Sequence, residues 1–502
     1  MANVKIGWAE ESIVPGKKIF LDGQFYERVS DIVESEITAT AMAISCGSEK
    51  AILISVDIAA IFDGLLQRIR REFQRICPDF PAEHLIVGAT HTHTSIQYKE
   101  MQDSSVNAQI LHEFMPDTAS YASLVNVEGD DVLHGEEASE FIATRVAQAA
   151  KNAWDNRKDA LVANGFGRAV VGFCRRVVYD DGSAQMWGDT NTPNFVAMEG
   201  GNDSGVELLY VFDTNKKLTG VVANIACPSQ ILEHHSFISS DYWGKVKENL
   251  RRHFGDDLFL LAMGGAGGDQ CPRDLIRWVN AENPINDPNI KRPDLIDRIA
   301  GPSMFDLPGC RLVGKRIANE IISVFEELPE PKPVDTFYYR RVPMALPLRK
   351  TTIQQHEQAL RELNYYASKM EGKSEFNFED TAAMYIYAGT VARFRQQQTQ
   401  ETVSVELHIL RLGDIAIATN PFELFLDYGN RIRARSRAKQ TFIMQLTGGW
   451  AGYLPTQKAE QGGHYSAYIS SGFVGHEGGD LMTRNTIDII NCLMANNGTD
   501  CL

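Results

Sequence analysis

The sequence lacks the segments that would send it into or across a membrane. No uninterrupted apolar run is long enough to span a bilayer, and no apolar stretch follows the single lysine near its start. Its eight cysteines are scattered, without the close spacing of a zinc ribbon or a small disulfide scaffold. We therefore expect an unexported, cytoplasmic protein whose thiols are reduced.

Basic residues are also scarce. The 502 residues include 49 Lys and Arg against 65 Asp and Glu, which gives a formal net charge of −16 at pH 7. Such a chain repels phosphate backbones and anionic lipid surfaces, and no stretch combines clustered basic residues with interleaved aromatics. We expect no nucleic acid and no membrane as partners, which leaves a small-molecule substrate; the oligomeric state stays open.

The pattern that is present predicts an α/β protein. The buried-strand run AILISVDI (51–58) is followed by helical periodicity over 62–76 and a second strand-like run, HLIVGA (84–89). We predict mixed, largely parallel sheets with flanking helices. Further strands are expected at 206–212, 218–226, 258–263, 337–343, 403–412, 415–419 and 442–446, and further helices at 136–154, 353–370 and 381–398. One domain over residues 1–502 is expected, with a possible subdomain boundary at 329–334, where PEPKPV cannot continue a helix.

Two histidines follow the strand at 84–89. The segment VGATHTHTS places His91 and His93 two residues apart, so that in extended backbone both imidazoles point the same way. This arrangement suits metal binding or proton transfer. The alternative is a hydrogen-bonded pair at a strand end.

Two cysteines also follow predicted strands. Cys227 comes directly after 218–226 and is a soft metal ligand, with His234 and His235 as alternatives, or else a small buried apolar side chain. In GGAGGDQCPRD, Pro272 suits the first position of a helix. Cys271 would then lie at a positive helix terminus that favours a thiolate, or it is an inert thiol in a tight turn.

A carboxylate and a phenol occupy similar places late in the chain. Glu423 follows the strand at 415–419 in IATNPFELF, and Tyr453 lies in the glycine-rich segment TGGWAGYLPT after the strand at 442–446. Both can complete a set of zinc ligands. Taken alone, Glu423 fits better as a helix-start carboxylate and Tyr453 as a half-buried aromatic.

Taken in order, these segments resemble the catalytic region of neutral/alkaline ceramidases, zinc amidases that split the N-acyl bond of ceramide. The resemblance runs from GWAEESIVPG to GYLPTQKAEQGGHY. It implies zinc (Zn2+) bound by His91 of ATHTHTS, Glu423 of NPFELF and Tyr453 of the Ala-Gly-Tyr segment. It also implies that His93 and Tyr465 lie beside the substrate.

The resemblance further implies an active-site arginine in GFCRRVVYDDG, which we assign to Arg175, with Arg176 next to it. Two positions depart from the family. Cys227 stands where the family has its second zinc histidine, so the predicted ligands are His91, Cys227, Glu423 and Tyr453, a softer set that zinc still accepts. Cys271 replaces the active-site serine of the family's Gly-Asp-x-Ser-Pro-Asn loop.

The resemblance implies a zinc-dependent hydrolase, an amidase that uses a metal-activated water. Members of the family commonly carry an export signal and a C-terminal β-sandwich domain; we expect neither here, and therefore expect ceramide to be a poor substrate. One alternative is a zinc- or cysteine-dependent hydrolase of a polar substrate such as a glycoside, with Cys271 as a possible nucleophile. Another is a non-catalytic binding homologue.

Overall fold

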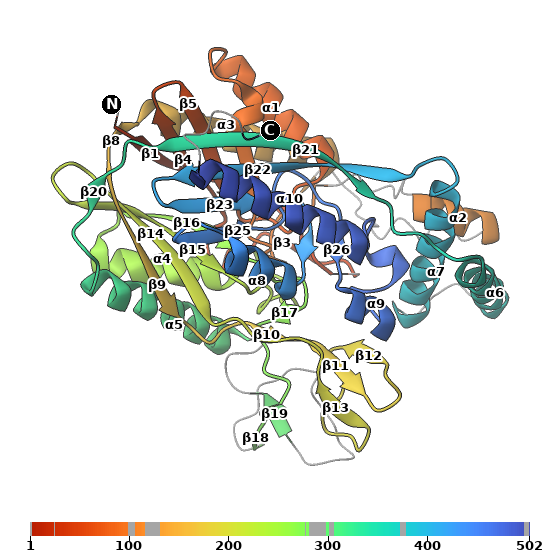
Figure 1. Ribbon diagram of the computed structural model, residues 1–502. Coiled ribbons are helices and arrows are strands. Elements are labelled where there is room, and N and C mark those ends of the chain that lie inside the picture. Colours follow the sequence, from red (N-terminus) through yellow and green to blue (C-terminus); the bar gives the residue numbers. More distant parts are fainter. Residues whose placement is uncertain are drawn as a thin grey trace.

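Three large β-sheets form the centre of the computed structural model (Figure 1). The structure describes residues 3–24, 26–98, 106–115, 131–276, 278–280, 298–300, 306–371, 378–495 and 501. The first sheet, in spatial order, consists of β6 (Leu85–Ala89), β5 (Glu49–Val56), β4 (Thr38–Cys46), β1 (Lys5–Ser12) and β8 (Lys158–Asp159). The second consists of β16 (Phe259–Gly264), β15 (Leu218–Ile225), β14 (Gly205–Phe212), β9 (Leu161–Arg168) and β20 (Lys332–Pro333). The third consists of β21 (Phe337–Pro347), β22 (Thr402–Leu412), β23 (Ile415–Thr419) and β25 (Gln440–Met444).

The central strands of each large sheet are buried on both faces. Their inner faces share one apolar core, to which Trp8, Leu209 and Phe442 each contribute from a different sheet. A pair of helices packs on each outer face through a core of its own. These pairs are α1 (Asp63–Ile76) with α3 (Gly135–Asp155), α4 (Asp241–Phe254) with α5 (Leu307–Glu326), and α8 (Leu426–Arg435) with α10 (His476–Ala495). The apolar strand runs of the sequence are explained by this double burial.

Smaller elements surround this body. A cluster of three helices stands to one side in Figure 1, consisting of α2 (Val106–Phe114), α6 (Ile353–Met370) and α7 (Phe378–Gln396). A small sheet projects below, with β11 (Arg176–Tyr179), β12 (Ala184–Met186) and β13 (Phe195–Met198). The remaining elements are β2 (Lys18–Phe20), β3 (Val29–Ser30), β7 (Val132–Leu133), β10 (Phe173–Cys174), β17 (Gln270–Cys271), β18 (Trp278–Asn280), β19 (Arg298–Ala300), β24 (Glu423–Leu424), β26 (Tyr453–Leu454), α9 (Gln457–Gly462), and the short 3-10 helices Ala82–His84 and Ile469–Ser471.

The prediction of largely parallel sheets is wrong. Most neighbouring strands are antiparallel, and each large sheet has one parallel pair: β5 with β6, β15 with β16, and β23 with β25. Continuous apolar runs are typical of parallel strands because those strands are buried on both faces. Here antiparallel hairpins are buried equally well, between a second sheet and a helix layer, so the runs did not distinguish the two arrangements.

The parallel pairs position the site. The edge strands β6, β16 and β25 come together at their carboxyl ends, where Ala89 N donates to Leu446 O at 3.1 Å. At the same place Gln445 N donates to Gly264 O at 3.0 Å. The loops that follow these three strands therefore start from one place in the molecule.

Three further expectations concern the chain as a whole. Cys492 and Cys501 form a disulfide with a Cα–Cα distance of 5.6 Å, so the prediction that all eight cysteines are reduced is wrong for this pair. Within the described ranges, no helix is both long and apolar enough to span a membrane. The segment at 329–334 contains β20, which pairs with β9 of the second sheet.

Candidate functional site

His91 leaves β6 in a left-handed backbone conformation, with φ of +66°. Such strain in a residue other than glycine often marks a functional position. Its Nδ1 lies 2.6 Å from the carbonyl oxygen of Ala59. Because a carbonyl only accepts, Nδ1 carries the hydrogen and Nε2 of the neutral ring is a bare lone pair. Burial lowers the pKa of His91, which favours this neutral form.

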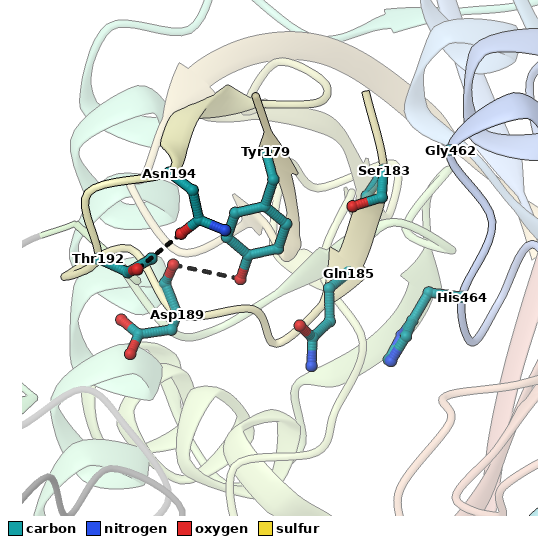
Figure 2. A pocket seen from close by; sticks show the side chains of 9 residues that line it. Tyr179, Ser183, Gln185, Asp189, Thr192, Asn194, Gly462 and His464 are labelled. Atoms are coloured by element: carbon teal, nitrogen blue, oxygen red, sulfur yellow. Dashed lines mark hydrogen bonds between the residues drawn. The ribbon is translucent and has the colours of Figure 1, made fainter. Parts of the chain in front are cut away.

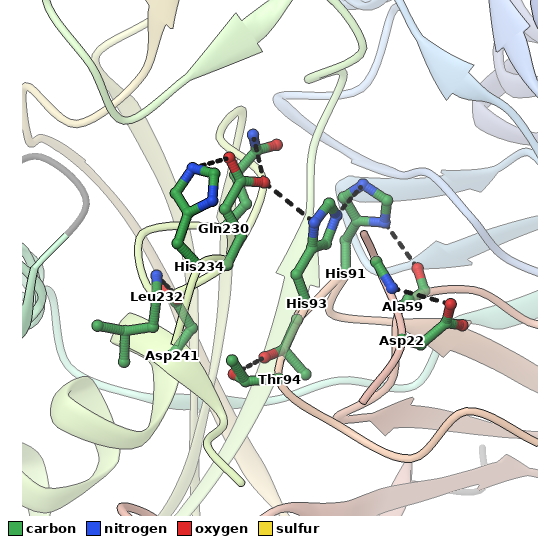
Figure 3. A network of polar contacts seen from close by, with 12 residues as sticks. Asp22, Ala59, His91, His93, Thr94, Gln230, Leu232, His234 and Asp241 are labelled. Carbon is green, nitrogen blue, oxygen red and sulfur yellow. Dashed lines mark hydrogen bonds and ion pairs between the residues drawn. The ribbon is translucent and has the colours of Figure 1, made fainter. Parts of the chain in front are cut away.

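His93 faces His91. Their Nε2 atoms lie 3.3 Å apart (Figure 3), and His93 Nδ1 lies 3.1 Å from Glu233 Oε2. The ring fits closely against the backbone of Gly23, where a Cβ atom would lie 2.4 Å from His93 Cγ. Two imidazole nitrogens therefore converge on one point, which a proton or a cation can occupy.

Glu423 and Tyr453 are neighbours in two short parallel strands. Glu423 is the register partner of Tyr453 in the pairing of β24 with β26. Glu423 Oε2 lies 3.6 Å from His91 Nε2, and Trp450 Nε1 donates to Glu423 Oε1 at 3.5 Å. Burial raises the pKa of Tyr453 well above its usual value, and the charge of Glu423 adds to this rise. His91, Glu423 and Tyr453 are thus brought together from three different loops.

Of the two adjacent arginines, Arg175 is the one that reaches this site. Its Nη2 donates to Gly268 O at 2.9 Å and to the Tyr453 hydroxyl at 3.3 Å, and its Nη1 donates to Gln230 Oε1 at 3.3 Å. Arg176 instead donates to Glu199, with Nε 2.6 Å from Oε2. Both guanidinium groups are buried. That of Arg175 contacts the side chain of a predicted site residue, Tyr453, whereas that of Arg176 reaches Tyr465 only through its backbone oxygen, at 3.0 Å.

Tyr465 lies beside Tyr453, with ring centroids 5.5 Å apart. Burial raises the pKa of Tyr465 to about 12, so its hydroxyl keeps its hydrogen at neutral pH. The preceding residue, His464, lines a separate open cavity of about 520 Å³ (Figure 2). Polar side chains dominate this cavity, among them Gln185, Asp189 and Asn194.

Cys227 is buried, and its sulfur is engaged with carbonyl oxygens. It lies 3.4 Å from Val171 O and 3.6 Å from Pro228 O, and burial raises its pKa well above the usual value. Of the alternatives, His234 Nε2 lies 3.6 Å from Glu233 Oε1, and the ring of His235 stacks on Phe237. In the described part of the chain, no group of three or more His, Cys, Asp or Glu side chains is arranged to hold a metal ion.

The prediction of a helix terminus at Cys271 is wrong. Cys271 belongs to β17, which pairs with β10 so that Phe173 and Cys271 are partners, and residues 272–276 form no helix. Without a helix dipole, burial dominates and raises the pKa of this thiol to about 12. Its sulfur donates to Arg273 O at 3.2 Å. A thiol in this state is not an activated nucleophile.

Sequence reasoning missed the residues that hold the predicted ones in place. Glu233 contacts His93, Gln230 accepts from Arg175, and Trp450 donates to Glu423. Glu233 stands beside His234 and His235, the two residues of this segment that the sequence offers as alternative metal ligands. No spacing in the sequence signals a contact between residues 93 and 233.

Comparison with known proteins bears on the fold. No family model matches the sequence, and no curated protein matches it. The crystal structure of neutral ceramidase from Pseudomonas aeruginosa matches with a TM-score of 0.65 at 14% identity, over 98% of this chain and 75% of that one. A ceramidase complexed with C2 matches with a TM-score of 0.64 at 12% identity and the same two coverages, 98% and 75%. The predicted ceramidase-like fold is confirmed; at these identities the match shows the fold alone.

Proposed function

We propose that this protein is a zinc-dependent hydrolase that cleaves an N-acyl or similar bond with an activated water. The observation that carries the proposal is the position of the bare Nε2 of His91, 3.6 Å from Glu423 Oε2 and beside the strand partner Tyr453. The neutral ceramidase fold supports it, because that fold belongs to an amidase.

The donor atoms suit zinc. Zinc in proteins takes imidazole nitrogen and carboxylate oxygen, and the hydrogen bond from His91 Nδ1 to Ala59 O is the support that a ligating histidine usually has. His91, Glu423 and Tyr453 would hold the ion. Cys227 would complete the set only if its sulfur left the carbonyls of Val171 and Pro228. When bound, zinc lowers the pKa of a water toward about 7 and polarises a carbonyl.

The other side chains of the site act on the attacking water, the leaving nitrogen and the oxyanion. His93 Nε2 accepts a proton from the attacking water and returns it to the leaving nitrogen as the C–N bond breaks. Tyr465 keeps its hydroxyl hydrogen at neutral pH and donates to the oxyanion. Arg175 holds the Tyr453 hydroxyl and adds positive charge beside the developing oxyanion.

A second candidate is a hydrolase of a polar substrate such as a glycoside. The polar cavity lined by His464 favours it, because hydroxyl and amide groups of its lining offer donors and acceptors to a hydroxylated ligand. The buried thiol of Cys271 does not support a cysteine nucleophile. A non-catalytic binding protein is the third possibility.

One experiment separates the three. The full chain, purified and loaded with zinc, is tested on chromogenic N-acyl, ester and glycoside substrates and on long-chain ceramide in detergent, with His93→Ala as the inactive control. We expect N-acyl turnover that His93→Ala abolishes and little turnover of ceramide. Glycoside turnover alone favours the second candidate, and no turnover of any substrate, with no bound zinc, favours the third.

A further inference from the structure

We propose that Glu233 is a positioning residue that fixes the ring orientation and tautomer of His93. The inference rests on the proposed hydrolase function, in which His93 Nε2 moves the proton. Nothing in the resemblance to ceramidases assigns a role to this carboxylate, and the contact between Glu233 and His93 carries the inference.

The carboxylate of Glu233 is buried, with the residue 9% exposed, and each of its oxygens faces an imidazole. Oε2 lies 3.1 Å from His93 Nδ1, and Oε1 lies 3.6 Å from His234 Nε2. Gln230 Nε2 donates to Oε2 at 3.5 Å. Gln230 in turn accepts from Arg175, so Glu233 is linked to both sides of the site.

This placement decides which nitrogen of His93 is available. An ionised carboxylate only accepts, so it selects the tautomer with hydrogen on Nδ1 and leaves Nε2 bare. That Nε2 is the atom directed at His91, 3.3 Å from its Nε2. Burial alone would raise the pKa of Glu233, but the contact with His93 and the positive charge of Arg175 lower it, so the carboxylate stays ionised. Arg28 and Arg273 add positive charge nearby.

The same carboxylate compensates the charge that forms during reaction. When His93 Nε2 takes a proton from water, the oxygen bonds to the carbonyl carbon and the ring becomes an imidazolium next to Glu233. When Nε2 gives that proton to the departing nitrogen, the ring is neutral again and one water has been consumed. A group in this position orients the base and stabilises its charged form.

A purely structural role fits the contacts poorly. The ion pairs of Glu233 in the described residues join it to His93 and His234, two histidines that are charged only when protonated. A buried carboxylate without a permanent cation in contact costs stability. Glu233→Gln is therefore expected to leave the melting temperature unchanged or raised, while turnover falls. This opposition of stability and activity is typical of functional groups.

The test combines enzyme kinetics with an NMR measurement of the His93 tautomer. In the full zinc-loaded chain, Glu233→Gln is expected to lower kcat by about 10² to 10⁴ with KM changed less than about threefold, and Glu233→Asp, which keeps the charge, to recover part of kcat. Glu137→Gln, which removes an exposed carboxylate paired with Lys17, is the matched control with unchanged kcat. Unchanged kcat in Glu233→Gln overturns the proposal.

Nitrogen NMR of ¹⁵N-histidine-labelled protein reads the tautomer without any substrate. The His93 signals, identified by their loss in His93→Gln, are expected to show hydrogen on Nδ1 in the native chain and a mixture of tautomers in Glu233→Gln. If the tautomer does not change, Glu233 does not position His93. If the tautomer changes as expected but no substrate is hydrolysed, the hydrolase function fails and the positioning role stands.

Discussion

Arg175 Nη2 and the hydroxyl oxygen of Tyr453 lie 3.3 Å apart, and the guanidinium also holds the carbonyl of Gly268. Tyr453 is in turn the strand partner of Glu423. One buried cation therefore joins two of the loops that form the site. Its neighbour Arg176 is tied to Glu199 and contributes to the fold instead.

The two arginines should respond differently to the same substitution. Arg175→Met is expected to lower kcat/KM by about 10² to 10³, because a donor beside the oxyanion of the proposed reaction is lost, and to reduce stability less than the matching change at Arg176. Arg176→Met is expected to reduce the free energy of unfolding by about 3 to 5 kcal/mol, because Glu199 is left buried without its cation. Substrate kinetics and urea unfolding of both variants check this, and equal loss of stability in the two would contradict the assignment.

Cys271→Ser should retain activity within about tenfold of the native chain. A pKa of about 12 leaves almost no thiolate at pH 7, and serine has nearly the same size. Iodoacetamide at pH 7 should leave Cys271 unlabelled in the folded protein and label it after unfolding in urea. A covalent substrate adduct on Cys271, detected by mass spectrometry, would refute this.

Gly23→Ala should impair catalysis more than folding. The added Cβ would meet His93 Cγ at 2.4 Å, at a φ of +97° that alanine rarely adopts, so the ring of His93 must move. We expect kcat to fall at least about tenfold, since small misplacements of a catalytic base are costly. Gly16→Ala, where the new Cβ has no neighbour within 4 Å, is the matched control and should be neutral.

Asp241 should make the stability of the folded protein decrease as the pH rises. It is buried, accepts from the backbone N–H groups of Leu232 and Tyr242, and has its pKa raised by burial to about 7. The folded state therefore binds this proton more tightly than the unfolded chain, whose Asp has a pKa near about 3.9. The resulting stability is fully present below about pH 4 and is lost as the pH rises toward about 7.

The measurement is urea unfolding of the native chain and Asp241→Asn at pH 5 and pH 8. The stability advantage of the native chain over the variant should shrink by about 2 to 3 kcal/mol between these values. An advantage that stays constant or grows with pH would show that the carboxyl is not held protonated.

Much of the fold could be predicted from the sequence because burial leaves a local signature. The apolar runs at 51–58, 206–212 and 218–226 correspond closely to β5, β14 and β15, and the helical periodicity at 62–76 corresponds to α1. Strand direction has no such signature when both faces are buried, which is why the antiparallel pairing was missed.

The candidate site was predictable where a residue lies in the loop that follows a strand or in a segment that resembles the family. His91, Glu423 and Tyr453 follow β6, β23 and β25, and the structure brings them together. Glu233 lies in a turn with no periodic pattern, and its partner His93 is far away in sequence. Cys271 was placed at a helix start because of Pro272, but the backbone pairs with β10 instead.

The zinc content of the purified chain tests the central claim most directly. After equilibration with zinc and dialysis, elemental mass spectrometry of the native chain should show about one zinc per chain, and Glu423→Gln and His91→Asn should lose it while remaining folded by circular dichroism. Glu137→Gln should bind zinc as the native chain does. A native chain that hydrolyses its substrate without bound zinc, and at an unchanged rate after chelation, would contradict the proposed metal-dependent hydrolysis.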